Sequence, residues 1–184
     1  VTEPKQSVGD TRTWKMTIFT KPAQADLPAQ RIHIDICAVP SIDAQPVMLQ
    51  NYYQLDMRTS GLILRAEPKK EILADKWIAL ALRPNRVKQR DLWDIQWLTT
   101  QNTTFDTNIL HQKLNLRNKT SSEFVESLRE RLENLEHGYN DFLYEIKRFL
   151  PAGSLRETVD NPDYWTVLRN TLEEGYGWIV GSLK

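Results

Sequence analysis

The spacing of apolar residues changes at Pro68, and this change restricts the folds open to the chain. Before Pro68, Ile32, Ile34 and Ile36 alternate with polar residues, which is typical of a β-strand with one apolar face. After Pro68, apolar residues recur every third or fourth position, which is the spacing of amphipathic helices. We therefore expect an α+β fold in which a small sheet precedes an α-helical bundle.

The strand-rich part contains four predicted strands. Proline-containing loops at 21–28 and 40–46 separate the first three of them, because proline is poorly accommodated inside a sheet. The predicted strands cover residues 14–20, 31–37, 47–55 and 61–65.

The helical part contains five predicted helices. Thr120 and Glu123 form a capping-box pattern at the start of a long helix. Its apolar residues from Phe124 to Phe149 follow one continuous stripe, which Gly138 can bend or split. The predicted helices cover residues 69–82, 90–100, 107–116, 121–150 and 162–183.

Composition excludes several kinds of site. The 184 residues suit one domain, or a domain with a smaller appendage. The single cysteine, Cys37, excludes an internal disulfide and a cysteine-rich zinc site, and it fits a cytoplasmic location. Basic and acidic residues number 24 each, so no global field attracts nucleic acid. There is no signal-peptide pattern and no apolar run of about 18 residues, so we expect no membrane association.

Lys76 occupies an unusual position for a charged residue. On the helix predicted at 69–82 it lies on the face that contains Ile72 and Leu80. A lysine on a core-facing stripe loses hydration unless it is paired or reaches a polar cleft. Two interpretations stay open, because the side chain can extend along its neighbours to the surface or direct its charge at a phosphate.

Asp91 and Asp94 raise the same question in the next predicted helix. They are three residues apart and share a face with Ile95. The helix dipole favours acidic residues in a first turn, which accounts well for Asp91 and less well for Asp94. Alternatively, both carboxylates pair with Lys76 across the contact between the two helices, which keeps each group charged.

Asp35 lies in the middle of a predicted strand, where aspartate is uncommon. It shares the polar face with Arg31 and His33. If this face is in water, Asp35 is simply exposed. If the face lines a cleft, Asp35 is a candidate metal ligand or general base.

Two segments, EILADKWIALALR at 71–83 and RDLWDIQWL at 90–98, resemble the AbiEii-type nucleotidyltransferase toxins of bacterial toxin–antitoxin and abortive-infection systems. The pattern of that family is E-x-x-A-x-K-x-x-A-L, a short basic link, and then R-D-x-x-D-L. The chain matches it except for Ile95 in place of the final leucine. The segment RIHIDI also resembles the acidic strand of the family, with Asp35 as the acidic residue.

The resemblance implies a function for these residues. Lys76 and Arg90 would bind a nucleoside triphosphate, and Asp35 would hold Mg²⁺. Asp91 or Asp94 would position Lys76 or the acceptor, which is expected to be RNA such as tRNA. A cognate antitoxin is the expected protein partner. The implied fold is a small mixed nucleotidyltransferase-like sheet at 1–67 and a helical domain at 68–184.

One departure from the family pattern affects this interpretation. The family has a Gly-Gly or Gly-Ser turn followed by an Asp-x-Asp pair, and no Asp-x-Asp occurs in the 184 residues. We therefore expect the C-terminal part of a longer nucleotidyltransferase, with a sheet incomplete on its N-terminal side and no transfer by the chain alone. The alternatives are a non-catalytic scaffold that binds an antitoxin, RNA or another subunit, and a domain in which Lys76 and Asp94 form a structural ion pair.

Overall fold

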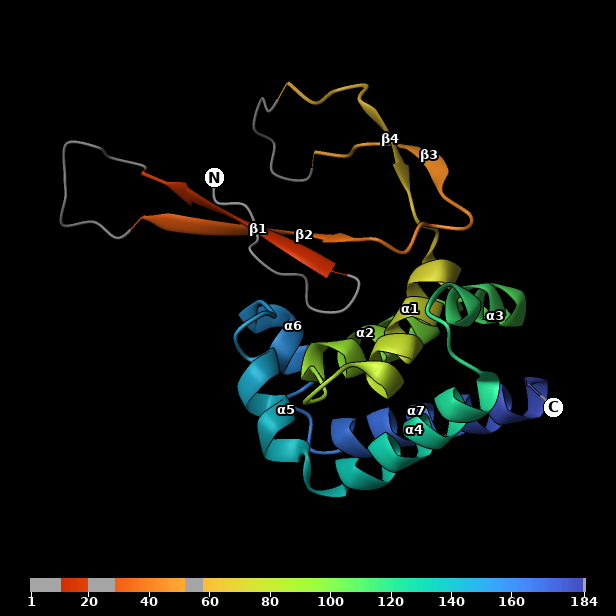
Figure 1. The fold of residues 1–184 in the computed structure, drawn as a ribbon. Helices are drawn as coiled ribbons and strands as arrows, with labels where there is room; N and C mark the ends of the chain where they lie inside the picture. The colour runs from red at the N-terminus through yellow and green to blue at the C-terminus, as the bar shows by residue number, and fades with distance from the viewer. Residues whose placement is uncertain (1–10, 20–28, 52–57, 184) are drawn as a thin grey trace. The chain divides into compact units, whose positions relative to one another are not determined.

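The computed structural model describes residues 11–19, 29–51 and 58–183. The chain divides into two compact units, residues 1–40 and 41–184. Strands precede a group of helices along the chain (Figure 1), so the predicted α+β class and the helical bundle after a small sheet are confirmed. Our division at 67/68 separates strand-rich from helical sequence and remains a prediction.

The unit at 1–40 contains an antiparallel hairpin of β1 (Thr11–Ile18) and β2 (Gln30–Cys37). The register pairs Trp14 with Ile34, and residues directly opposite each other lie on one face. Trp14 therefore shares a face with the isoleucines of β2, as the spacing of two predicts. Thr20 and the loop at 21–28 lie outside the described residues.

A second antiparallel hairpin opens the other unit. It pairs β3 (Gln45–Met48) with β4 (Ile63–Ala66), and Val47 lies opposite Leu64. The prediction of a strand at 47–55 is right only at its start, since β3 ends at Met48 and residues 52–57 lie outside the described part of the chain. Gly61, predicted to begin a strand, has a φ of 78° and belongs to a turn.

The next three helices match their predicted limits to within one residue. They are α1 (Lys69–Leu82), α2 (Gln89–Thr100) and α3 (Thr107–Leu116). Helix α1 ends at Arg83, which is extended because Pro84 follows it. Helix α3 begins where the Asp106 carboxylate accepts hydrogen bonds from the N–H groups of Asn108 and Ile109.

The helix predicted at 121–150 is not continuous. The capping box of Thr120 and Glu123 opens α4 (Ser121–Glu133), as predicted. A 3₁₀ turn, η1 (Asn134–His137), follows, and α5 (Tyr139–Ile146) begins after Gly138. The prediction of a single buried stripe is wrong at its end, because α5 ends at Ile146 and Phe149 lies in the turn that follows it. Phe149 has an exposed fraction of 55%.

The chain ends with one helix that was not predicted and one that was. The unpredicted helix is α6 (Ala152–Glu157), which begins directly after Pro151, a position that proline tolerates well. The final helix, α7 (Tyr164–Ser182), confirms the prediction at 162–183 apart from its ends. None of the described helices is long and apolar enough to cross a membrane.

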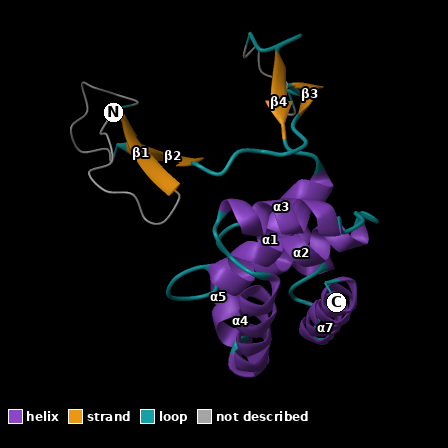
Figure 2. Cartoon of the chain, turned by 45° about the vertical axis from the view of Figure 1, so that its right-hand side comes forward, coloured by secondary structure: helices purple, strands orange, loops and turns teal. Residues whose placement is uncertain are grey.

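Helix α1 contacts α2, α3 and α4, and so contributes to most of the helical core (Figure 2). Burial of each large apolar side chain contributes about 1.5–3 kcal/mol. These contacts fix the faces of α1 and α2 relative to each other, which is what positions their charged residues. The fully buried core side chains include Leu80, Leu92, Ile95, Leu110, Phe124, Leu128, Phe142 and Leu168.

Candidate functional site

The contact between α1 and α2 brings Lys76 to both of the aspartates that the sequence singled out. The Lys76 Nζ lies 2.8 Å from Asp91 Oδ1 and 2.5 Å from Asp94 Oδ2. Both carboxylates reach it because residues three positions apart share one face of a helix. The predicted pairing across the two helices is therefore present, and it involves Asp91 and Asp94 together.

The two aspartates differ in their exposure. The Asp91 side chain has an exposed fraction of 3%, whereas the values for Lys76 and Asp94 are 26% and 31%. Asp91 also accepts a hydrogen bond from Arg83 Nη2 at 2.7 Å. Asp91 is therefore a fixed anion held by two cations, and Asp94 is the partner of Lys76 that ligands can reach.

The sequence reasoning missed Arg83. It lies directly after α1, and the extended turn before Pro84 directs it to α2. With Arg83 included, this group contains two cations and two anions and is neutral overall. We call Lys76, Asp91, Asp94 and Arg83 the Lys76 cluster.

Lys76 remains protonated at neutral pH. Burial lowers the pKa of its ammonium group, but hydrogen bonds and charge attraction from Asp91 and Asp94 outweigh burial, so the pKa is raised above its ordinary value. A charged and partly exposed lysine next to a partly exposed carboxylate can exchange one partner for a phosphate oxygen.

A second lysine cluster joins α3 to the first half of α1. The Lys113 Nζ, from α3, lies 2.7 Å from Glu71 Oε1, 2.7 Å from Asp75 Oδ2 and 3.3 Å from Glu67 Oε1. Lys113 and Glu71 have exposed fractions of 1% and 0%. Oxygens of Glu67, Glu71 and Asp75 lie within 4.8 Å of one another, close enough to hold a metal ion. The ammonium already occupies that position, so this Lys113 cluster fits an ion-pair network and not a cation site.

Glu71 also fixes the chain before β3. Its carboxylate accepts hydrogen bonds from Ser41 Oγ at 2.9 Å and from the N–H groups of Ile42 and Asp43 at 2.7 and 2.9 Å. Burial raises the pKa of Glu71, but the hydrogen bonds from Lys113 and from the backbone outweigh burial and give a pKa of about 2. The glutamate of the E-x-x-A-x-K pattern therefore holds the segment 41–43 against α1.

The sequence reasoning also missed Lys113, although a signal was present. Lys113 is four residues after Ile109 and three after Leu110, so it shares their buried face. The argument that singled out Lys76 applies equally to Lys113.

Asp35 lies in the other unit, on the exposed strand β2. Its Oδ1 accepts a hydrogen bond from Thr13 Oγ1 at 2.6 Å, across the β1–β2 pair. Asp35 is thus exposed on the polar face that the alternation predicts. Its geometry is described within this unit alone, and its role as a metal ligand stays a prediction.

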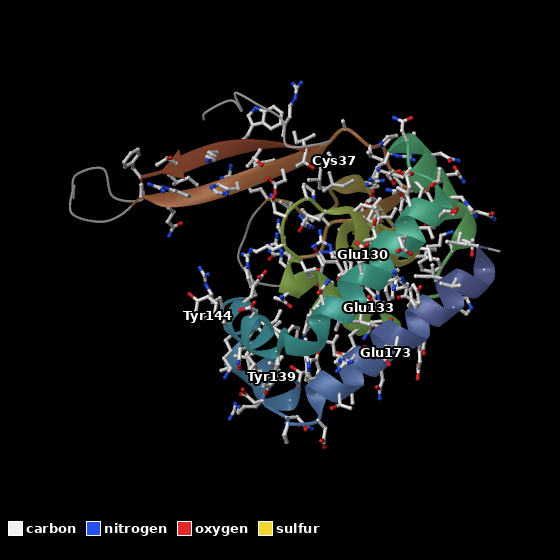
Figure 3. The ribbon with its side chains drawn as sticks, turned by 60° about the horizontal axis from the view of Figure 1, so that its bottom comes forward. Cys37, Glu130, Glu133, Tyr139, Tyr144 and Glu173 are labelled. Carbon is white, nitrogen blue, oxygen red and sulfur yellow. The ribbon has the colours of Figure 1, made fainter. Side chains whose placement is uncertain are left out.

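Arg90 lies at the start of α2 but does not extend toward Lys76. Its guanidinium carbon is 5.6 Å from the centre of the Phe149 ring, and Arg148 lies 5.9 Å from the Tyr144 ring. Arg86 completes this group through an ion pair with Glu145 at 3.6 Å. Figure 3 shows Tyr144 on α5 pointing away from the helices. This aromatic–arginine surface therefore joins the first turn of α2 to the end of α5.

These features can be compared with known proteins. A family model described as the nucleotidyl transferase AbiEii toxin of a type IV toxin–antitoxin system matches residues 1–170. The chain belongs to this family. The predicted resemblance to this family is confirmed, and the matched residues include both hairpins. No curated protein and no solved structure matches the chain.

Membership places the chain among the nucleotidyltransferase-like toxins of type IV toxin–antitoxin systems. The family implies a nucleotide substrate, a divalent metal and a cognate antitoxin. A divalent cation needs oxygen ligands, and the carboxylates of this chain differ in how well they can supply them. The exposed carboxylate of Asp35 and the partly exposed carboxylate of Asp94 offer oxygens of the kind that Mg²⁺ prefers, whereas the Lys113 ammonium already occupies the space between Glu67, Glu71 and Asp75.

Proposed function

We propose that this chain acts in nucleotide transfer from a nucleoside triphosphate to an RNA acceptor, with Lys76 binding the triphosphate. One observation carries the proposal: Lys76 is charged and partly exposed, and a buried aspartate holds it in place. Transfer of this kind depends on positioning and on stabilising negative charge at the phosphates. A fixed ammonium group is suited to both tasks.

The two aspartates take different roles in this proposal. Asp91, fixed by Arg83, holds Lys76 from the buried side. Asp94 lies on the accessible side, where it orients Lys76 before the nucleotide binds and the acceptor afterwards. In this way both predicted aspartates contribute, one as an anchor and one at the site.

Mg²⁺ is the expected cofactor, and when bound it would neutralise charge on the triphosphate. The family resemblance assigns Mg²⁺ to Asp35, and this assignment stays a prediction about the unit at 1–40 alone. The absent Asp-x-Asp pair means that this assignment rests on one strand aspartate. Measuring nucleotide binding, with and without Mg²⁺, tests the proposal without requiring turnover.

The first experiment compares Lys76→Met with wild type in titrations with each of the four ribonucleoside triphosphates. We expect binding to weaken by about tenfold or more, since a charge-assisted contact contributes roughly 1.5–3 kcal/mol. Lys70→Met is the matched control, because Lys70 lies on the same helix and pairs with Asp43 and Asp106. Equal binding by the Lys76→Met variant and wild type would contradict the proposal.

The aromatic–arginine surface supports a nucleic-acid acceptor. Tyr144 and Phe149 have exposed fractions of 73% and 55%, and arginines lie over both rings. Exposed rings stack on the bases of single strands, and nearby arginines attract the phosphates. Arg90 is part of this surface, and in the sequence it directly precedes Asp91 of the Lys76 cluster.

The acceptor can be tested with a labelled single-stranded RNA oligonucleotide. We expect the double variant Tyr144→Leu and Phe149→Leu to bind it about tenfold more weakly. Trp97→Leu is the control, because Trp97 is also exposed and has Lys69 5.5 Å from its ring. If both variants bind as wild type does, this surface does not bind the acceptor.

A further inference from the structure

A cavity in the helical unit lies apart from the Lys76 cluster. It has a volume of about 440 Å³ and lies between α1, the segment 99–105 and α7. That volume falls within the range of small-molecule sites, which is roughly 300–1,000 Å³. Trp77 lines it, whereas the adjacent Lys76 does not, because successive helical residues are turned by about 100°. The lining residues are Leu73, Trp77, Thr99, Thr103, Thr104, Phe105, Thr171, Glu174, Gly175 and Trp178.

Three aromatic side chains form the walls. Phe105 and Trp178 are packed edge to face, with ring centres 5.0 Å apart. Trp77 lies against Gly175, where an added Cβ would be 2.5 Å from the indole carbon Cζ2. Only glycine at position 175 leaves the Trp77 ring where it is. The cavity is therefore an aromatic site with one half-exposed wall, since Trp178 has an exposed fraction of 50%.

The polar atoms of the lining are mainly acceptors. The Thr99 and Thr171 hydroxyls donate to the carbonyls of Ile95 and Val167, so their remaining capacity is to accept. Glu174 adds a carboxylate, and the buried Thr103 hydroxyl has no hydrogen-bond partner among the described residues.

The lining has no positive charge to offer an anion. None of the described residues around the cavity is lysine, arginine or histidine. A triphosphate would meet Glu174 with no cation to compensate, so the cavity does not suit the proposed substrate. A cation with N–H groups is the complementary ligand, since aromatic faces attract positive charge and a carboxylate accepts charge-assisted hydrogen bonds.

We propose that this cavity binds an organic cation, an alkylguanidinium or alkylammonium group. The cationic head contacts the ring of the half-exposed Trp178 and donates hydrogen bonds to Glu174. The Thr103 hydroxyl then gains a polar neighbour. This site is independent of the proposed nucleotide transfer, because it shares no residue with the Lys76 cluster.

The test uses n-butylguanidinium and its neutral counterpart n-butylurea, titrated into the ¹⁵N-labelled chain. The tryptophan indole N–H signals report binding. The one indole signal that is missing from the spectrum of the Trp178→Leu variant belongs to Trp178. We expect saturable shifts with butylguanidinium and about tenfold weaker binding of butylurea. Equal affinity for the two probes, or no saturable shift, would overturn the proposal.

Two neighbouring glutamates provide a matched pair of variants. Glu174→Gln should weaken butylguanidinium binding by about tenfold and leave butylurea unchanged. Glu173→Gln should change neither, because Glu173, the residue before Glu174 on α7, is not among the lining residues and pairs with Arg169 at 3.3 Å (Figure 3). If both variants weaken binding equally, the ligand responds to general surface charge and the assigned site is wrong.

The source of the cation is resolved by a second probe. The capped tripeptide acetyl-Gly-Arg-Gly-amide carries the same guanidinium on a peptide. Tighter binding of the tripeptide than of butylguanidinium assigns the site to an arginine side chain of a bound protein, and weaker binding assigns it to a free amine or guanidine.

Discussion

The Lys76 and Lys113 clusters both pair a lysine with carboxylates, and the two lysines differ in burial. Each has a lysine ammonium between carboxylates carried on α1 or α2. Lys76 has an exposed fraction of 26%, and Lys113 has one of 1%. An ion pair that water cannot reach contributes to the fold, whereas one open on one side can exchange a partner for a ligand. Exposure, more than residue type, therefore distinguishes the candidate functional lysine from the structural one.

Lys113→Met should have the largest effect on stability. It leaves the buried Glu71 without its closest cation, and breaking a buried pair costs about 3–5 kcal/mol. Urea denaturation followed by circular dichroism measures the change in the free energy of unfolding. Lys119→Met is the control, because Lys119 pairs with Glu123 in an exposed position. A loss as small as that of the control would show that Lys113 is not structural.

Acid should destabilise the fold through Glu71. The pKa of Glu71 is about 2 in the folded chain, below its ordinary value of 4.5. Its contribution, of the order of 3 kcal/mol, is therefore present above about pH 4.5 and is lost as the pH falls toward 2. Denaturation at a series of pH values should show this slope, and Glu71→Gln should flatten it. An unchanged slope in Glu71→Gln would assign the acid sensitivity to other carboxylates.

Lys76→Met should have a smaller effect on stability than Lys113→Met. Asp91 keeps its hydrogen bond from Arg83, so we expect the free energy of unfolding to fall by about 1–2 kcal/mol. The same urea titration gives this value. A loss as large as that of Lys113→Met would remove the distinction between the two clusters.

Asp94→Asn should have the smallest effect on stability. The pair of Lys76 and Asp94 is partly exposed, and such pairs contribute about 0–1 kcal/mol. The variant retains the shape of the side chain, so its thermal unfolding should nearly match wild type. A loss well above this range would mean that Asp94 belongs to the buried network together with Asp91.

The sequence predicted the elements better than their long-range contacts. The limits of α1 and α3 follow from apolar spacing and from the proline and aspartate at their ends, which are local signals. The apolar stripe failed at Phe149, because α5 already ends at Ile146 and Phe149 lies in the turn after it, an end that residue spacing does not encode.

The site was predictable where charge broke a local pattern. Lys76 and Asp94 were identified because they lie on apolar faces, and the structure pairs them. Arg83 lies outside the helix, so no periodicity marks it. Lys113 broke the same pattern as Lys76, but its carboxylate partners come from a different part of the chain. Pairing between distant segments depends on helix packing, and helix packing is not visible in spacing.

The most direct test of the account is nucleoside triphosphate binding by folded Lys76→Met protein. The account predicts a chain that unfolds cooperatively in urea and binds the nucleotide at least about tenfold more weakly than wild type. A folded Lys76→Met variant with the nucleotide affinity of wild type would contradict it, because Lys76 would then be a structural residue like Lys113.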